Sequence, residues 1–181
     1  MTDRLSKLLN SFDSHIGIPW PNAVSPDERT IFVIYNKEDE LKLRARIGEF
    51  EASAEQSGHP WLQLDLTLSF EEWMAEQDYK ETYFEDPEYL TGIYEDFSDE
   101  LVEKLVAEIS INQTDDSVVA LLGCGALFGF ASVSGVVESV AKHVKGRLVV
   151  FFPGEYQNNN FKLLDAKDGW GYHATAITAM S

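Results

Sequence analysis

Short segments of apolar and β-branched residues alternate along the chain with segments of helical spacing. The segments that predict strands are Thr30–Tyr35, Trp61–Leu66, Val118–Leu122 and Leu148–Phe152. A segment that is apolar at every position, such as Val118–Leu122, is typical of a strand covered on both faces of a parallel sheet. The alternation therefore predicts the α/β fold class, with a central, open, mostly parallel sheet of Rossmann-like type flanked by helices.

Apolar residues with helical spacing fill the intervals between these strands. They predict helices over residues 2–13, 39–58 and 133–144. Ser98 is the expected N-cap of a further helix, because acidic residues follow it in what would be the first turn.

The C-terminal tail continues the pattern. Residues 161–164 and 172–178 predict short strands, the second at an edge of the sheet, and residues 169–171 predict a turn between them. No internal repeat, low-complexity segment or linker divides the sequence. We therefore expect a single domain over residues 1–181.

Residues 67–97 form an acidic-aromatic segment, in which carboxylates and aromatic side chains are interleaved. Lys80 is its only basic residue. Surface helices whose aromatic residues face the core would account for this pattern, and so would a surface that binds a protein partner. The candidate partner residues are Trp73, Tyr79, Tyr83, Phe84 and Tyr89.

The charge narrows the range of partners. The formal net charge is -17, with 14 Lys and Arg against 31 Asp and Glu. Direct nucleic-acid binding depends on Lys and Arg that neutralise phosphates, so it is not expected without a local basic patch. Lys142, Lys145 and Arg147 are the candidates for such a patch. A solvated acidic surface, a basic protein partner and DNA mimicry stay open as interpretations.

Composition indicates a globular protein of the cytoplasm. Hydrophobic residues make up 44% and aromatic residues 12% of the chain, which are globular values. No apolar run approaches the roughly 20 residues that span a bilayer, and the first residues lack a signal-peptide core, so no membrane association is expected. One cysteine excludes an internal disulfide, which fits a cytoplasmic location.

A glycine loop at Gly123 and Gly125 follows the third predicted strand, where backbone amides can bind phosphate. The dinucleotide fingerprint needs a third glycine where Phe128 stands, and Gly129 comes one residue late. No Walker A sequence is present either. We therefore expect no cofactor, and a tight turn that lets a helix pack closely is the simpler interpretation.

Residues suited to catalysis or metal binding are few and scattered. A lone cysteine beside a core strand, such as Cys124, is usually a small buried hydrophobe and not a nucleophile. The 4 histidines lack His-x-x-x-His spacing, and no Cys-x-x-Cys or Gly-x-Ser-x-Gly sequence occurs. The sequence therefore predicts no catalytic residue and no metal site.

Polar residues or glycine stand at or just beyond the end of each main strand. They are Asn36, Asp65, Gly123 and Glu155. The carboxyl ends of parallel strands meet at one edge of the sheet, where open α/β proteins bind ligands, so these residues could converge on a site. A carboxylate that caps a turn is the alternative role for Glu155.

Two blocks of the sequence resemble the BrxB family of the BREX phage-defence systems. Leu148–Tyr156 ends in the motif Phe-Pro-Gly-Glu-Tyr, and Leu121–Phe130 is similar to a strand followed by Gly-x-Gly-Ala and aromatic residues. A weaker match covers Ile31–Arg46. The family-motif residues of the two main blocks are Gly123, Gly125, Pro153, Gly154, Glu155 and Tyr156.

The chain departs from the family pattern at three positions. Family members tend to have proline at the position of Gly129, arginine near Ser132, and arginine where His173 aligns. The loss of both arginines would weaken an anion site at the carboxyl edge of the sheet. It favours a partner role over a catalytic one.

The resemblance implies a small component without an assigned reaction, encoded beside a methyltransferase, a large ATPase and an alkaline-phosphatase-like PglZ protein. It implies a non-enzymatic adaptor or scaffold that binds other BREX proteins, the PglZ-like component above all. The alternative hypothesis is a nucleotide-binding or hydrolytic enzyme that uses the loops at the carboxyl edge.

Overall fold

Helices and strands alternate in the computed structural model, which describes residues 3–21, 23–77, 85, 88, 90–164, 166 and 169–179. In chain order its elements are α1 (Arg4–Ile16), β1 (Thr30–Tyr35), η1 (Lys37–Asp39), α2 (Glu40–Ala45), α3 (Ile47–Gln56), β2 (Trp61–Asp65), α4 (Ser69–Ala75), α6 (Leu90–Asn112), β3 (Val118–Leu122), η3 (Cys124–Leu127), α7 (Val133–Ala141), β4 (Arg147–Gln157), β5 (Asn160–Leu163), β6 (Trp170–Gly171) and β7 (Thr175–Ile177). The expected α/β class is confirmed.

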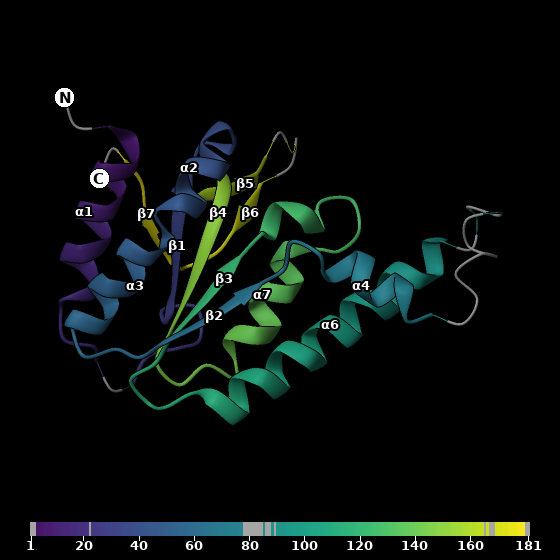
Figure 1. Cartoon of the computed structure of the whole chain (residues 1–181), viewed down its shortest axis with the longest axis horizontal. Helices are drawn as coiled ribbons and strands as arrows, with labels where there is room; N and C mark the ends of the chain where they lie inside the picture. Colours follow the sequence, from purple (N-terminus) through teal and green to yellow (C-terminus); the bar gives the residue numbers. More distant parts are fainter. Residues whose placement is uncertain are drawn as a thin grey trace.

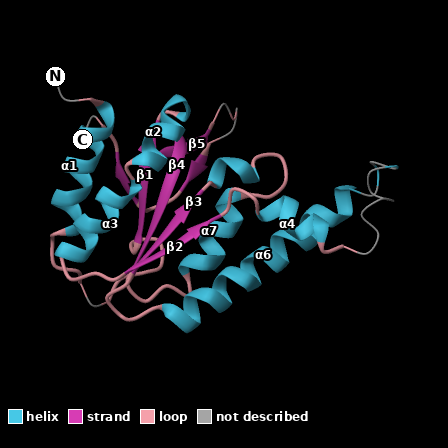
Figure 2. Ribbon diagram, in the orientation of Figure 1, coloured by secondary structure: helices cyan, strands magenta, loops and turns pink. Residues whose placement is uncertain are grey.

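The strands of the described residues join into one sheet (Figure 2). Its main path has the order β2-β3-β4-β1-β7, and each neighbouring pair on this path is parallel. β5 and β6 are added by antiparallel pairing to the C-terminal part of β4. The open, mostly parallel sheet predicted from the sequence is confirmed, and β7 is the expected edge strand.

Helices cover both faces of the sheet (Figure 1). Ile31 and Val33 of β1 belong to a core shared with α1 and α3, whereas Phe32 and Ile34 belong to a core shared with α6 and α7. Successive side chains of a strand point to opposite faces, so a strand between two helical layers is apolar at nearly every position. This explains why β1, β3 and β4 lack polar alternation.

The helices depart from the sequence prediction at two places. The predicted helix over residues 39–58 is interrupted at Arg46 and forms α2 and α3. Ser98 is not an N-cap, because it lies inside α6, which begins at Leu90. Buried side chains spaced four residues apart continue through this position: Ile93, Phe97, Leu101, Leu105 and Ile109. Burial of this continuous stripe extends the helix past the capping signal.

β4 is longer than predicted, because Pro153 and Gly154 do not end it. Pro153 is the last residue paired with β1, and Gly154 is the first paired with β5. A Cβ atom at Gly154 would collide with the carbonyl oxygen of Lys162, so this close approach needs glycine. The Pro-Gly pair therefore changes the partner of the strand. The turn predicted at residues 169–171 is wrong in part, because β6 forms there and pairs with β5.

Candidate functional site

Residues at or just beyond the carboxyl ends of the parallel-paired parts of β1, β2, β3 and β4 line a cleft of about 270 Å³, here called the carboxyl-edge cleft. Its lining residues are Lys37, Glu40, Arg44, Thr67, Gly123, Gly125, Ala126, Pro153 and Leu164. The chain leaves β1 toward α2 and α3 on one face of the sheet and leaves β3 toward α7 on the other. The cleft therefore lies at the switch point of the sheet, where open α/β proteins bind ligands.

The residues expected to converge at this edge lie there as two neighbouring pairs. Asp65 accepts a hydrogen bond from the backbone N–H of Thr67 at 3.0 Å. A Cβ atom at Gly123 would lie 2.5 Å from the hydroxyl oxygen of that same Thr67. Asn36 and Glu155 line an adjacent hollow. The edge thus gathers all of these residues, but Gly123 lines the carboxyl-edge cleft, Asn36 and Glu155 line the adjacent hollow, and Asp65 lines neither.

Arg44 connects the polar groups of the carboxyl-edge cleft. Its Nη1 lies 2.9 Å from Asp65 Oδ2, and its Nε lies 3.0 Å from Glu40 Oε1. It also donates to the hydroxyl of Thr67, and Tyr35 donates to Glu40. The sequence prediction missed Arg44 as a site residue, although the spacing of Glu40 and Arg44 on α2 was a signal for an ion pair. The guanidinium charge of Arg44 is therefore neutralised by Glu40 and Asp65, which makes it a poor binding group for an anionic ligand.

The pKa shifts of the titratable groups near the cleft follow from burial and from hydrogen bonds within the protein. Partial burial acts to raise the pKa of Asp65, but hydrogen bonds from Arg44 and Thr67 outweigh it and hold the pKa below its usual value. Burial raises the pKa of the Cys124 thiol to about 12, and the nearby Glu40 carboxylate adds to this. A cysteine nucleophile needs the opposite, a lowered pKa and an exposed thiolate. Burial and the hydrogen bond to Glu40 also raise the pKa of Tyr35.

The glycine loop differs in shape from a phosphate-binding loop. Gly123 has φ +79°, a conformation that favours glycine, and packs on the turn that carries Thr67. The 3-10 helix η3 follows, and α7 begins only at Val133, where the Ser132 side chain accepts from the N–H of Gly135 at 3.2 Å. Phosphate-binding loops lead directly into the N-terminus of an α-helix. The loop here joins β3 to η3 in a tight turn.

The second family motif builds the antiparallel extension of the sheet. Glu155 is exposed and lies opposite Lys162 on β5, and the ring of Tyr156 packs on Phe161 at 4.7 Å. Asn158 and Asn159 both have positive φ and join β4 to β5 in a two-residue hairpin turn. Glu155 therefore lies in a strand and not in the loop that the sequence predicted.

The Arg44 network makes a prediction for acid solution. We expect Asp65→Asn to be less stable than wild type at pH 7 by roughly 0.5–1 kcal/mol, the range for a partly exposed ion pair. Since the folded-state pKa of Asp65 is lowered, its contribution is present above the pKa of unfolded aspartate, about 3.9, and is lost as pH falls through the folded-state value. Urea unfolding at a series of pH values measures the difference.

The control for this prediction is Asp115→Asn, because the Asp115 side chain is 88% exposed and its Oδ1 lies 3.9 Å from Lys145 Nζ. It should leave stability nearly unchanged at every pH. A difference between wild type and Asp65→Asn that persists unchanged well below pH 3 would contradict the role of the Asp65 charge.

The acidic-aromatic segment is described only in part. Tyr79, Tyr83, Phe84 and Tyr89 lie outside the described residues. Trp73 is 9% exposed, packs against Phe97 with ring centroids 5.5 Å apart, and donates its indole N–H to Glu100. Its side chain therefore packs mainly in the core under α4 and α6, and it also lines the groove described next, so its part in binding a partner stays a prediction.

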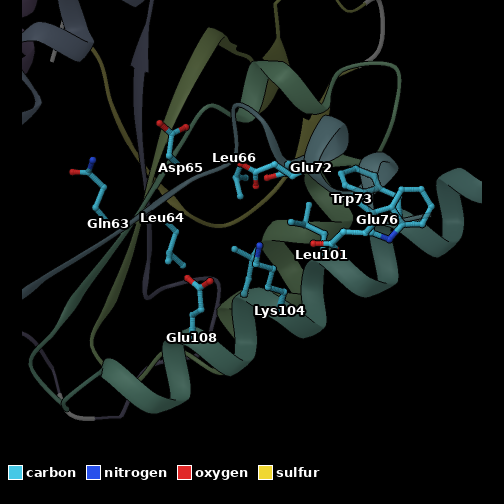
Figure 3. A pocket seen from close by; sticks show the side chains of 13 residues that line it. Gln63, Leu64, Asp65, Leu66, Glu72, Trp73, Glu76, Leu101, Lys104 and Glu108 are labelled. Atoms are coloured by element: carbon cyan, nitrogen blue, oxygen red, sulfur yellow. The ribbon is translucent and has the colours of Figure 1, made fainter. Parts of the chain in front are cut away.

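A groove borders this segment between β2, α4 and α6, here called the β2 groove (Figure 3). Its volume is about 170 Å³. Buried or nearly buried apolar side chains form its floor, among them Leu64, Leu66, Trp73, Leu101 and Leu105. The carboxylates of Glu72, Glu76 and Glu108 stand around it, and Lys104 is the one basic side chain among the described lining residues. The groove combines an apolar floor with an acidic rim.

Among the described residues, no group of at least three His, Cys, Asp or Glu side chains is placed to hold a metal ion. No helix in the described part of the chain has the length and apolar character needed to cross a membrane.

Comparison with known proteins gives one match. The family model described as BREX protein BrxB matches residues 64–177, more than half of the chain. No curated protein and no solved structure matches. The matched region runs from β2 to β7 and includes both the glycine loop and the Phe-Pro-Gly-Glu-Tyr motif. The chain therefore belongs to the BrxB family of BREX phage-defence proteins.

Proposed function

We infer that this protein is a non-enzymatic adaptor that binds other proteins of the BREX system, with the PglZ-like component as its main partner. The observation that carries this proposal is the β2 groove, whose apolar floor and acidic rim lie beside the acidic-aromatic segment. Apolar and aromatic side chains supply the anchors of protein interfaces, and surrounding carboxylates steer a basic partner toward them.

The charge distribution supports a protein partner over nucleic acid. Arg4, Arg44 and Arg46 each pair with a carboxylate. Arg147 is buried, and its guanidinium lies 4.6 Å from the centre of the Trp20 ring. Of the basic patch considered from the sequence, only Lys142 and Lys145 are exposed. These four arginines are therefore engaged within the protein, which leaves them poorly placed to neutralise phosphates.

The adaptor proposal predicts a salt-sensitive complex. We expect the tagged protein to retain a purified BREX component, the PglZ-like one first, at low salt and to lose much of it at high salt, because exposed charges are screened. Tyr83→Ala and Tyr89→Ala should reduce retention at least several-fold while the protein stays folded. Leu41→Ala is the matched control, because Leu41 on α2 is 82% exposed and lies outside the acidic-aromatic segment.

Two results would count against this proposal. One is failure to retain any BREX component while the purified protein shifts duplex DNA at physiological salt.

The other result concerns the alternative function, a nucleotide-binding or hydrolytic enzyme, which the position of the carboxyl-edge cleft favours. A nucleotide or divalent metal at 100 times its dissociation constant would stabilise the protein by about 2.7 kcal/mol. Such stabilisation, abolished by Glu155→Ala or Gly125→Val, would replace the adaptor proposal.

A further inference from the structure

We propose that the β2 groove binds an extended, basic segment of the partner protein, which pairs with the open edge of β2 as an additional strand. This inference rests on the adaptor function proposed above and specifies how the partner is held. Strand addition is a common mode of peptide recognition, in which main-chain hydrogen bonds give affinity and alternate side chains give specificity.

The open edge is defined by the order of the sheet. β2 stands at one end of the main path, and β3 is its only neighbouring strand among the described residues. The N–H of Leu66 donates to Leu122 at 2.8 Å, and the carbonyl of Pro60 accepts from Val118 at 2.8 Å. Even-numbered positions of this strand therefore bond to β3. Since alternate residues of a parallel strand face opposite neighbours, the backbone groups of Trp61, Gln63 and Asp65 face the open edge.

The edge lacks the features that usually prevent pairing. Natural edge strands are commonly protected by lysine, proline or a bulge. Residues 61–65 contain no lysine, arginine or proline. Their one charged side chain, Asp65, forms an ion pair with Arg44 of α2. Among the residues that the structure describes, no strand pairs with this edge, and the sequence of β2 does not oppose a further strand.

The β2 groove beside this edge determines which side chains an added strand should carry. Leu64 and Leu66 of β2 pack in the core shared with α4 and α6, so alternate side chains of an added strand would point over the same helices. There they would meet the carboxylates of Glu72 and Glu76 around the apolar floor (Figure 3). Lysine or arginine fits both parts, because its aliphatic stem covers apolar surface and its charged end reaches the rim.

A second copy of this chain is a poor occupant. With a net charge of -17, two copies repel each other. The β2 edge of a second copy would also bring its own Glu72 and Glu76 toward those of the first. Charge complementarity therefore favours a basic segment of a different protein.

The decisive variant is Gln63→Pro. The N–H of Gln63 faces the open edge, so proline removes a hydrogen bond to the added strand without removing one to β3. We expect Gln63→Pro to weaken binding of the purified PglZ-like component at least tenfold, measured by isothermal titration. Gln63→Ala keeps the N–H and should bind within about twofold of wild type. Melting curves of both variants check that the fold is intact.

Two double variants test the role of the acidic rim, and amide hydrogen exchange tests whether a strand pairs with β2. The double change Glu72→Lys and Glu76→Lys should weaken binding at least tenfold. The double change Glu71→Lys and Glu103→Lys alters the net charge equally on exposed positions outside the groove and should have a much smaller effect. In the complex, amide exchange should slow at Trp61, Gln63 and Asp65, the alternate positions that an added strand would cover.

The outcomes separate the two proposals. Undiminished binding by Gln63→Pro, with no new protection at the alternate amides, overturns strand addition and leaves the adaptor function in place. Failure of the wild-type protein to bind any BREX component overturns both. Loss of binding in Gln63→Pro and Glu72→Lys with Glu76→Lys, but not in the matched controls, supports strand addition by a basic segment.

Discussion

Replacing Phe151 with alanine is expected to lower the free energy of unfolding by about 3–5 kcal/mol. Phe151 is fully buried on β4, which lies between β3 and β1 in the sheet. Its ring meets Phe50 of α3 edge to face at 5.2 Å and lies 6.3 Å from the ring of Trp61. Alanine would leave a cavity between α3 and the sheet, so the lost transfer free energy and the cavity both destabilise the protein.

Urea denaturation measures this effect, provided that the slope of the transition is unchanged. Phe128→Ala is the matched control, because the Phe128 ring is 50% exposed and its removal should lower stability by less than about 1 kcal/mol. An unchanged midpoint for Phe151→Ala would contradict its position in the core.

The main strands were predictable because burial on two faces changes their composition. β3 and β4 lie between two helical layers, and their apolar residues leave no face for polar side chains. β2 was also predictable, but its edge position was not. Its alternation of Leu62, Gln63, Leu64 and Asp65 reflects one covered face, and only the strand order shows which edge stays open.

The errors arose where distant residues override local signals. Ser98 has a strong capping preference, yet the buried Phe97 and Leu101 on either side keep the chain helical. Pro153 and Gly154 have turn preferences, yet β5 supplies a new partner and the strand continues. In each case tertiary packing outweighs a local preference that is worth only about 1 kcal/mol.

The carboxyl edge was predictable in its parts and not in its connections. Asp65 and Gly123 were expected at this edge because both follow parallel strands. Arg44 was not, since its ion pair with Asp65 joins the connection after β1 to the end of β2, and these strands are not neighbours in the sheet. That pairing changes the interpretation of the edge, because the cation that could have held an anion is already neutralised.

The two edges of the protein therefore suit different roles. At the carboxyl edge, Glu40, Arg44 and Asp65 bind one another, and Gly123 closes against Thr67. At the β2 edge, backbone groups and an acidic groove form the surface proposed above to bind a partner. The first arrangement stabilises the fold and the second is suited to recognition, which is the division expected of an adaptor.

This division predicts that Gly123→Ala acts on stability. The change should lower the free energy of unfolding by about 2–4 kcal/mol, the sum of an unfavourable positive φ for alanine and overpacking in a filled space. Gly123 has φ +79°, and a Cβ atom there would lie 2.5 Å from the Thr67 hydroxyl oxygen and 2.8 Å from Asp65 Oδ1. The urea midpoint again provides the measurement.

Gly129→Ala separates the two causes. Gly129 has φ +86°, but nothing lies within 4 Å of the position of an added Cβ atom. It should therefore show only the backbone contribution, about 1–2 kcal/mol. If both variants were destabilised equally, the close contact of Gly123 with the Asp65–Thr67 turn would carry no energy. A larger loss in Gly123→Ala, with partner binding retained by the folded fraction, would place the glycine loop in the framework of the protein and outside its recognition surface.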